Sequence, residues 1–283
     1  MSAPTDLAAA DHPAEPDATR SSGPGFGATF AAEWSKFWSA RSPRRNLVLG
    51  AVLGVALSAL LALAAGATFD DWSDGDRAAF DPLLYSMSGA MIAAVFFVAV
   101  GAKVSTAEYS SRLIDLTFSV TPRRRRVVGA KVAVVALATW AAGGVAVVGM
   151  VAASQAVFGA FDTESIGLLE SETIRTLVLV ILTVPVFPVL AVLLGFLFRS
   201  TAPTITVALA LLFGPWVFGG LFPLWWRENV FSLLPGPAAD AVSIGHLDSS
   251  PMYLDTLPAA VVLVAWVVGS LVITSTVVDR RDT

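Results

Sequence analysis

The sequence predicts an all-α, polytopic membrane protein with six transmembrane helices. Three observations predict this fold class. Of the 283 residues, 55% are hydrophobic and only 14% are charged, whereas soluble domains carry about 25% charged residues. The apolar residues occur in long blocks, and about 20 consecutive apolar residues are enough for a helix to cross a bilayer. Basic residues gather between alternate blocks, as expected if those segments share one side of a membrane.

The chain begins with a polar tail and an aromatic segment. Residues 1–27 are rich in Ala, Pro, Asp and Ser, a composition that predicts disorder. Residues 28–283 are then expected to form one transmembrane domain. A helix is predicted over residues 26–41, with Pro43 ending it. We expect this helix to lie in the membrane interface, and the alternative is a core-facing helix of a soluble cap. Its aromatic face consists of Phe26, Phe30, Trp34, Phe37 and Trp38.

The apolar blocks define the predicted spans. In the first block, Gly50 and Gly54 allow a neighbouring helix to approach closely, although chance spacing in a glycine-rich helix explains them equally well. The third block is longer than one crossing needs, so we expect it to project beyond the membrane. Pro185 and Pro188 predict a kink in the fourth. The six blocks are residues 47–69, 82–104, 127–158, 174–198, 202–224 and 258–278.

The basic residues predict the orientation of the chain. Of the 18 Lys and Arg residues, only Arg77, Arg175 and Arg227 fall on one side of the predicted spans. Cytoplasmic loops carry the excess of Lys and Arg in membrane proteins. The side holding both termini is therefore assigned to the cytoplasm, which requires an even number of spans. Six spans meet this requirement.

The sequence contains no motif of a catalytic or metal site. Phosphate-binding loops, zinc-protease helices and nucleophile elbows are all absent. There is no cysteine, and His12 and His246 are isolated, so we expect no metal, no cofactor and no enzymatic activity. No predicted span has a charged residue near its centre, which argues against a proton- or sodium-driven carrier. Gln155, near the outer end of the third block, is expected to be an interface residue and not a ligand.

The segment between the second and third spans, residues 102–131, is the most informative. Ser105 or Thr106 can cap a short helix, in which Glu108 and Arg112 lie one turn apart and can pair. Its apolar face could lie on the bilayer, with the arginines at lipid phosphates, or dock into a soluble cytoplasmic partner. The residues themselves leave both readings open. That face consists of Tyr109, Leu113, Leu116 and Val120, before Pro122 and four arginines.

Several short motifs in this order carry a family resemblance. They are Glu33-Trp34-Ser35-Lys36 with Arg41-Ser42, Glu108-Tyr109-Ser110, Pro122-Arg123-Arg124 with Lys131, and the charged ending Asp279-Arg280-Arg281-Asp282. Together with the six-span spacing, they resemble actinobacterial permease subunits of exporter-type ABC transporters, the type-two ABC membrane protein family. The resemblance covers residues 28–283. One departure is Arg112, where many members have glycine.

The resemblance implies a function that the residues alone do not. It implies a permease subunit of the plasma membrane that forms the translocation path, dimerises with itself or a related chain, and contacts membrane lipids but no nucleic acid. ATP would be bound and hydrolysed by a separate ABC ATP-binding subunit. The helix near residue 30 would be a connecting helix, and residues 225–257 would form short outer helices that dip back into the membrane. The residues implied to couple to the ATPase are Glu108, Tyr109, Arg112, Leu113, Leu116, Arg123 and Arg124.

Other functions remain open on the sequence. A membrane anchoring or immunity module could bind a cytoplasmic partner through the same loops without transporting anything. A membrane-embedded enzyme acting on lipid would need clustered acids, histidines or a nucleophile within a span, and a secondary carrier would need buried charge. The apolar spans do not point to a particular substrate.

Overall fold

The computed structural model describes residues 25–110, 124–163, 166–167, 170–244 and 250–280. Within these ranges the chain forms helices and turns, without a strand. Six helical segments are long and apolar enough to cross a membrane, which confirms the all-α, six-helix prediction and fits a multi-pass membrane protein. They are Arg41–Asp71, Ala90–Tyr109, Arg124–Ala160, Ser171–Phe198, Thr201–Leu221 and Thr256–Arg280. Nearly all of the predicted tail lies outside the described residues.

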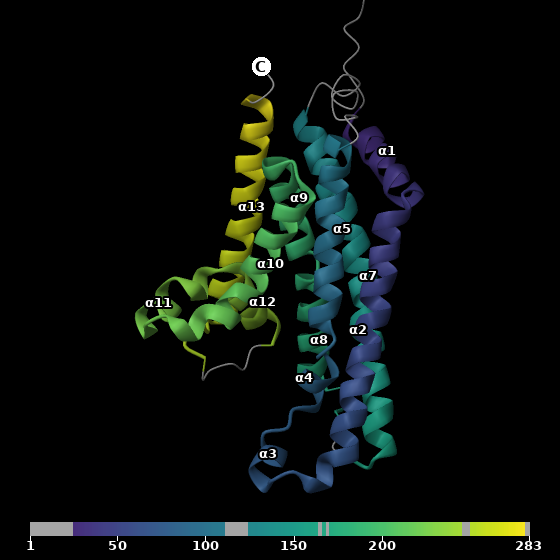
Figure 1. Cartoon of the computed structure of the whole chain (residues 1–283), viewed down its shortest axis with the longest axis vertical. Helices are drawn as coiled ribbons and strands as arrows, with labels where there is room; N and C mark the ends of the chain where they lie inside the picture. The colour runs from purple at the N-terminus through teal and green to yellow at the C-terminus, as the bar shows by residue number, and fades with distance from the viewer. Residues whose placement is uncertain (1–24, 111–123, 164–165, 168–169, 245–249, 281–283) are drawn as a thin grey trace, which may run out of the picture.

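The N-terminal helix and the first span meet at a bend. Helix α1 (Phe26–Ser39) covers the predicted aromatic segment, and α2 (Arg41–Thr68) follows after Ala40, whose backbone is extended. The expectation that Pro43 ends the first helix is wrong. Pro43 lies in the first turn of α2. Backbone N–H groups in the first turn have no partner within the helix, so proline at this position costs no helical hydrogen bond. In Figure 1, α1 is tilted away from α2 at one end of the bundle.

The second predicted span is interrupted near its N-terminal end. After η1 (Phe69–Asp71) and α3 (Asp74–Ala78), the short α4 (Pro82–Ser86) begins with Pro82, as predicted, and the Asp81 carboxylate accepts bonds from the backbone N–H groups of Leu83 and Leu84. Turns at residues 87–89 separate α4 from α5 (Ala90–Ser110). Residues 82–104 therefore form two helices in place of one.

Helix α5 also runs further than predicted, so the expected cap at Ser105 or Thr106 is wrong. Both residues are buried inside the helix. The Ser105 hydroxyl lies 3.2 Å from the Gly101 carbonyl oxygen, and the Thr106 hydroxyl lies 2.7 Å from that of Ala102. A hydroxyl that bonds back to the preceding turn satisfies itself within a helix. The span therefore continues through the polar residues to Ser110.

Glycines let α2 and the start of α5 come into close contact. A Cβ atom on Gly89 would lie 1.9 Å from the Gly54 carbonyl oxygen, and one on Gly50 would lie 2.9 Å from Cε1 of Phe97. The Gly89 backbone N–H donates to the Ser58 hydroxyl at 2.9 Å. The packing interpretation of Gly50 and Gly54 is therefore confirmed over chance spacing.

The third and fourth spans also match their predicted character. Helix α7 (Arg124–Ala160) has 37 residues and so is about 55 Å long, well beyond the roughly 30 Å of a hydrocarbon core. The fourth span consists of α8 (Ser171–Thr183) and α9 (Val186–Phe198), which are separated at Pro185. The predicted proline kink is present. A turn at Arg199, with φ of 53°, leads directly into α10 (Thr201–Phe218).

Short helices join the fifth and sixth spans. They are η2 (Gly219–Leu221), α11 (Leu224–Asn229), η3 (Phe231–Leu233) and α12 (Pro235–Ser243), followed by α13 (Thr256–Arg280). Figure 1 shows α11 and α12 beside the lower ends of α10 and α13, while α2 and α3 extend much further down. Helix α12 joins a core with α5, α9, α10 and α13, which includes Val98, Leu190, Ala208, Ala238 and Leu263.

Candidate functional site

Four charged residues form a cluster where α1, the end of α5 and the start of α7 meet. Lys131 Nζ lies 2.7 Å from Oε2 of Glu33 and 3.0 Å from Oε1 of Glu108. Lys36 Nζ lies 2.8 Å from Oε1 of Glu33 and 3.1 Å from Oε1 of Glu108. Each lysine thus bridges the same two carboxylates. We call Glu33, Lys36, Glu108 and Lys131 the charge cluster.

The charge cluster is buried mainly on the Lys131 side. The side chains of Lys131 and Glu33 are only 3% and 5% exposed, whereas that of Lys36 is 49% exposed. Burial by itself raises the pKa of Glu33, but the charges and hydrogen bonds of Lys131 and Lys36 outweigh it and hold the pKa below its ordinary value of 4.5. Burial lowers the pKa of Lys36, and the two glutamates raise it above its ordinary value. Two positive and two negative charges leave the cluster neutral.

Tyr109 connects the end of α5 to the turn between α9 and α10. Its ring lies edge-on to that of Phe196, with 6.2 Å between the centroids. The guanidinium carbon of Arg199 lies 5.3 Å from the Tyr109 ring centroid, a cation–π distance. Nearby, the hydroxyls of Thr106 and Thr201 lie 2.6 Å apart. Tyr109 is therefore half-buried against the bundle.

The start of α7 is joined to the end of α13. Arg124 donates from Nη1 to the Val278 carbonyl oxygen at 3.2 Å, and Arg125 Nε lies 2.5 Å from Oδ2 of Asp279. Of the residues predicted to couple to an ATPase, the structure places Glu108, Tyr109 and Arg124 at this one end of the bundle. Arg112, Leu113, Leu116 and Arg123 lie outside the described residues, so the coupling helix itself stays a prediction.

The aromatic face of α1 is divided between the bundle and the surface. Phe37 is 3% exposed and belongs to a core that Phe30 and Trp34 also contact. Trp38 is 42% exposed, and its ring is edge-on to those of Trp34 and Phe37. The aromatic residues thus both attach α1 to α2 and α7 and leave one indole at the surface. The interfacial placement remains a prediction.

The sequence interpretation missed the depth of Glu33. From the sequence, Glu33 was identified only as part of a motif, and no partner for it was predicted. In the structure Glu33 turns toward α7 because Lys131, 98 residues further along the chain, is its partner. The sequence signal was that both residues belong to the motifs that resemble a permease family.

Gln155 joins two segments by hydrogen bonds. Its Nε2 donates to the Ser86 hydroxyl at 3.0 Å, and its Oε1 accepts from the Ile166 N–H at 3.1 Å.

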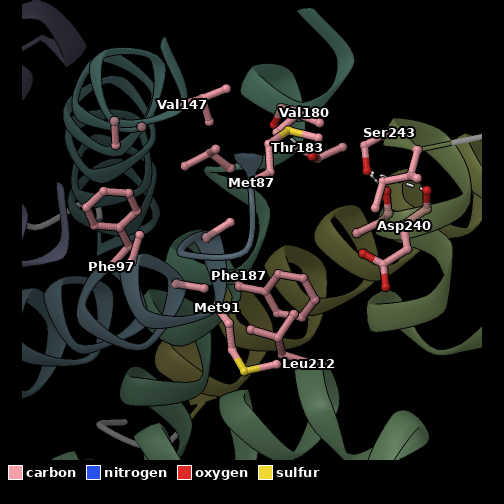
Figure 2. Close-up of a pocket in the computed structure, with 18 of the residues that line it drawn as sticks. Met87, Met91, Phe97, Val147, Val180, Thr183, Phe187, Leu212, Asp240 and Ser243 are labelled. Carbon is pink, nitrogen blue, oxygen red and sulfur yellow. Dashed lines mark hydrogen bonds between the residues drawn. The ribbon is translucent and has the colours of Figure 1, made fainter. Parts of the chain in front are cut away.

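A cavity of about 580 Å³ is lined by residues of α4, α5, α7, α8, α9, α10 and α12. Figure 2 shows Phe97 at one wall and Asp240 and Ser243 at the opposite wall. Apart from Thr183, Asp240, Ser243 and the Trp216 indole, its lining side chains are apolar. They include Met87, Met91, Phe97, Val147, Val180, Phe187 and Leu212.

Asp240 is the one charged residue of this lining. Every other residue of α12 is buried, and Asp240 alone keeps partial exposure. Among the described residues it forms a hydrogen bond with Trp216 and no ion pair. Helix α12 is not one of the six spans, and burial there raises the pKa of Asp240 to about 6, although the Trp216 hydrogen bond acts to lower it. The search for charge within the spans missed Asp240 because it lies between two of them.

The described part of the chain holds no group of three or more His, Cys, Asp or Glu side chains that could bind a metal ion. In comparisons with known proteins, no family model, no curated protein and no solved structure matches the chain. The features that bear on function are therefore the charge cluster, the contacts on either side of residues 111–123, and the cavity.

Proposed function

We propose that this chain is the transmembrane permease subunit of an ATP-driven ABC exporter. It would form the translocation path in a dimer and pair with a separate ABC ATP-binding subunit. One observation carries the proposal. The Glu33–Lys36 motif, the Glu108 motif and Lys131 are far apart in sequence, yet all contribute to the charge cluster. A shared structural role explains why these particular residues recur in the order that resembles the permease family.

The contacts around residues 111–123 suit a segment that transmits motion. Glu108, just before the segment, is ion-paired to α1 and α7, and Tyr109 is packed on the α9–α10 turn. After the segment, Arg125 is ion-paired to the end of α13. Because the close-packed interior of a protein transmits strain, a push on this segment by a partner would reach α1 and five spans, those that contain α5, α7, α9, α10 and α13. Such a linkage supports switching between inward- and outward-facing states.

In this proposal, transport and ATP hydrolysis are carried out by different subunits. It has no phosphate-binding loop in its sequence, so nucleotide binding and hydrolysis belong to the partner. The end of the bundle that carries α1 and the charge cluster faces the cytoplasm of a plasma-membrane protein, where the arginines that follow residue 122 can also approach lipid phosphates. Trp38 of α1 would then lie at the lipid interface.

Co-purification tests the proposal. The tagged chain is expressed together with any ABC ATP-binding subunit encoded next to its gene, and the detergent-solubilised complex is isolated. We expect the ATPase to be retained in equal amount, and replacement of Leu113 and Leu116 by Asp to release it. Failure of any such ATPase to bind contradicts the proposal. Binding without ATP-dependent flux in vesicles instead supports the anchoring or immunity module.

A further inference from the structure

The cavity beside α12 carries an inference about its ligand. We propose that this cavity binds a monovalent lipophilic cation, with the Asp240 carboxylate as its counter-charge. The site lies within one copy of the chain and is built from α4, α5, α7, α8, α9, α10 and α12. If the chain is a permease subunit, this deepens the proposed function by naming a substrate class. Binding itself requires neither an ATPase nor ATP.

The size and lining of the cavity suit an apolar body. Its volume of about 580 Å³ falls within the roughly 300–1,000 Å³ of small-molecule pockets. The walls are formed largely by Ala, Val, Leu, Met and Phe side chains from both halves of the bundle. Met91 and Val217, which line it, are 61% and 66% exposed, so the cavity is open at that side. An apolar compound dissolved in the outer part of the bilayer could therefore enter.

The charge of the cavity suits a cation. Asp240 contributes a carboxylate, and the lining contains no Lys, Arg or His. A largely desolvated carboxylate is costly without a partner of opposite charge, and partly exposed Asp240 has no ion pair among the described residues. A bound cation would supply that charge. An anion would be repelled, and a neutral compound would leave the carboxylate uncompensated.

Aromatic rings strengthen the preference for a positive charge. Phe97, Phe187, Phe213 and Trp216 all line the cavity. The face of an aromatic ring attracts a cation within about 6 Å, most strongly where water is excluded. The Trp216 indole also interacts with the Asp240 carboxylate. A single carboxylate in a cavity that is also lined by aromatic rings suits one delocalised or quaternary positive charge better than a strongly hydrated amine.

A pair of oppositely charged ions of nearly equal size and shape tests the proposal. Tetraphenylphosphonium is the cationic probe and tetraphenylborate the anionic one. Binding of each to the purified full chain in detergent is measured by isothermal calorimetry, without ATPase or nucleotide. We expect the cation to bind, and Asp240→Asn to weaken its binding about tenfold or more, since the lost attraction acts in a site of low dielectric constant. Asp240→Glu, which keeps the charge, should bind the cation nearly as the native chain does.

Two controls separate charge at the cavity from other effects. Asp255→Asn removes an exposed carboxylate outside the cavity and should leave cation binding unchanged. Ala94→Leu fills the cavity from α5 and should weaken cation binding without altering charge, which keeps the test decisive if Asp240→Asn does not fold.

The proposal is overturned if the native chain does not bind the cation, if Asp240→Asn binds it equally well, or if Ala94→Leu has no effect. It is also overturned if Asp240→Asn weakens binding of the borate as much. If the chain binds the cation through Asp240 but couples to no ATPase, the proposed function is refuted and the proposed binding site is supported.

Discussion

Lys131 is the residue on which the buried part of the charge cluster depends. It is almost fully enclosed and reaches both Glu33 and Glu108. Ion pairs are retained in an apolar interior only while every charge has a partner, because removing one partner leaves a desolvated charge behind. Lys36 is half-exposed, so it can compensate the glutamate charges only from the solvent-facing side of the charge cluster. The stability of the α1–α5–α7 junction therefore depends more on Lys131 than on any other charge in it.

Replacing Lys131 by Met should destabilise the protein strongly. We expect the free energy of unfolding, measured by denaturant titration in detergent micelles, to fall by about 3 kcal/mol, since two largely buried glutamates lose the more buried of the two lysines that they share. The matched control is Arg125→Ala, which breaks the largely exposed pair with Asp279 and should cost less than about 1 kcal/mol. Equal losses in the two variants would show that burial adds nothing to the charge cluster.

The lowered pKa of Glu33 predicts an acid-sensitive junction. A carboxyl whose folded pKa lies below its ordinary value of 4.5 stabilises the fold above that value and loses this contribution as the pH falls through the folded pKa. The melting temperature of the native chain should therefore drop as the pH falls below about 4.5. Glu33→Gln, which cannot ionise, should show a shallower drop over the same range. Parallel pH curves for the two proteins would contradict the assignment.

At the scale of elements, α5 and α9 are held together by a glycine contact. A Cβ atom on Gly101 would lie only 2.0 Å from the carbonyl oxygen of Pro188. Because the atoms in this contact belong to the two helix backbones, no flexible side chain can move aside to relieve it. The helices can keep their separation only if residue 101 has no side chain, and α9 presents this carbonyl just after the proline break.

Gly101→Ala should therefore separate α5 from α9. We expect a loss of about 1–3 kcal/mol in unfolding free energy, the usual cost of overpacking a core. Gly269→Ala in α13 is the matched control, because nothing lies within 4 Å of its added Cβ and alanine favours a helix more than glycine does. That control should be neutral or stabilising. If Gly101→Ala is as well tolerated as Gly269→Ala, the close contact does not exist in solution.

Comparison of elements shows what the sequence could and could not predict. The spans follow from local composition, so all six were found, as was the kink at Pro185. Their ends are harder to predict, because one residue can take either of two local roles: the Ser105 hydroxyl bonds within α5 and does not cap a new helix, and Pro43 lies in the first turn of α2 and does not end α1. The pairing of Glu33 with Lys131 and the position of Asp240 at a cavity are non-local. No pattern in a single sequence brings such residues together.

At the scale of the whole molecule, the basic segments gather at one end. Contacts link α1 to the start of α7, the start of α7 to the end of α13, and the end of α5 to the α9–α10 turn. Figure 1 shows α1 and the C-terminus at the same end, with α3 at the opposite end. The basic segments thus share one end of the bundle, as the distribution of Lys and Arg along the sequence predicts.

Single-cysteine labelling tests the orientation, and the chain suits it because it has no cysteine of its own. Asp74→Cys and Ser200→Cys place a thiol at an exposed position on opposite ends of the bundle. In intact cells, a membrane-impermeant maleimide should label Asp74→Cys, whereas Ser200→Cys should react only after the membrane is permeabilised. The reverse pattern would place the charge cluster outside the cell and exclude contact with a cytoplasmic ATPase.

The measurement that tests the central claim most directly is ATP hydrolysis by the complex reconstituted in lipid nanodiscs. The native chain should change the rate of its ATPase partner relative to the partner alone. Leu113→Asp combined with Leu116→Asp should return the rate to that of the partner alone, while Arg41→Asp, an exposed charge reversal near the same end, should not. An unchanged hydrolysis rate in the double variant would contradict a coupling role for residues 102–131, and with it the assignment of this chain as an ATP-driven permease.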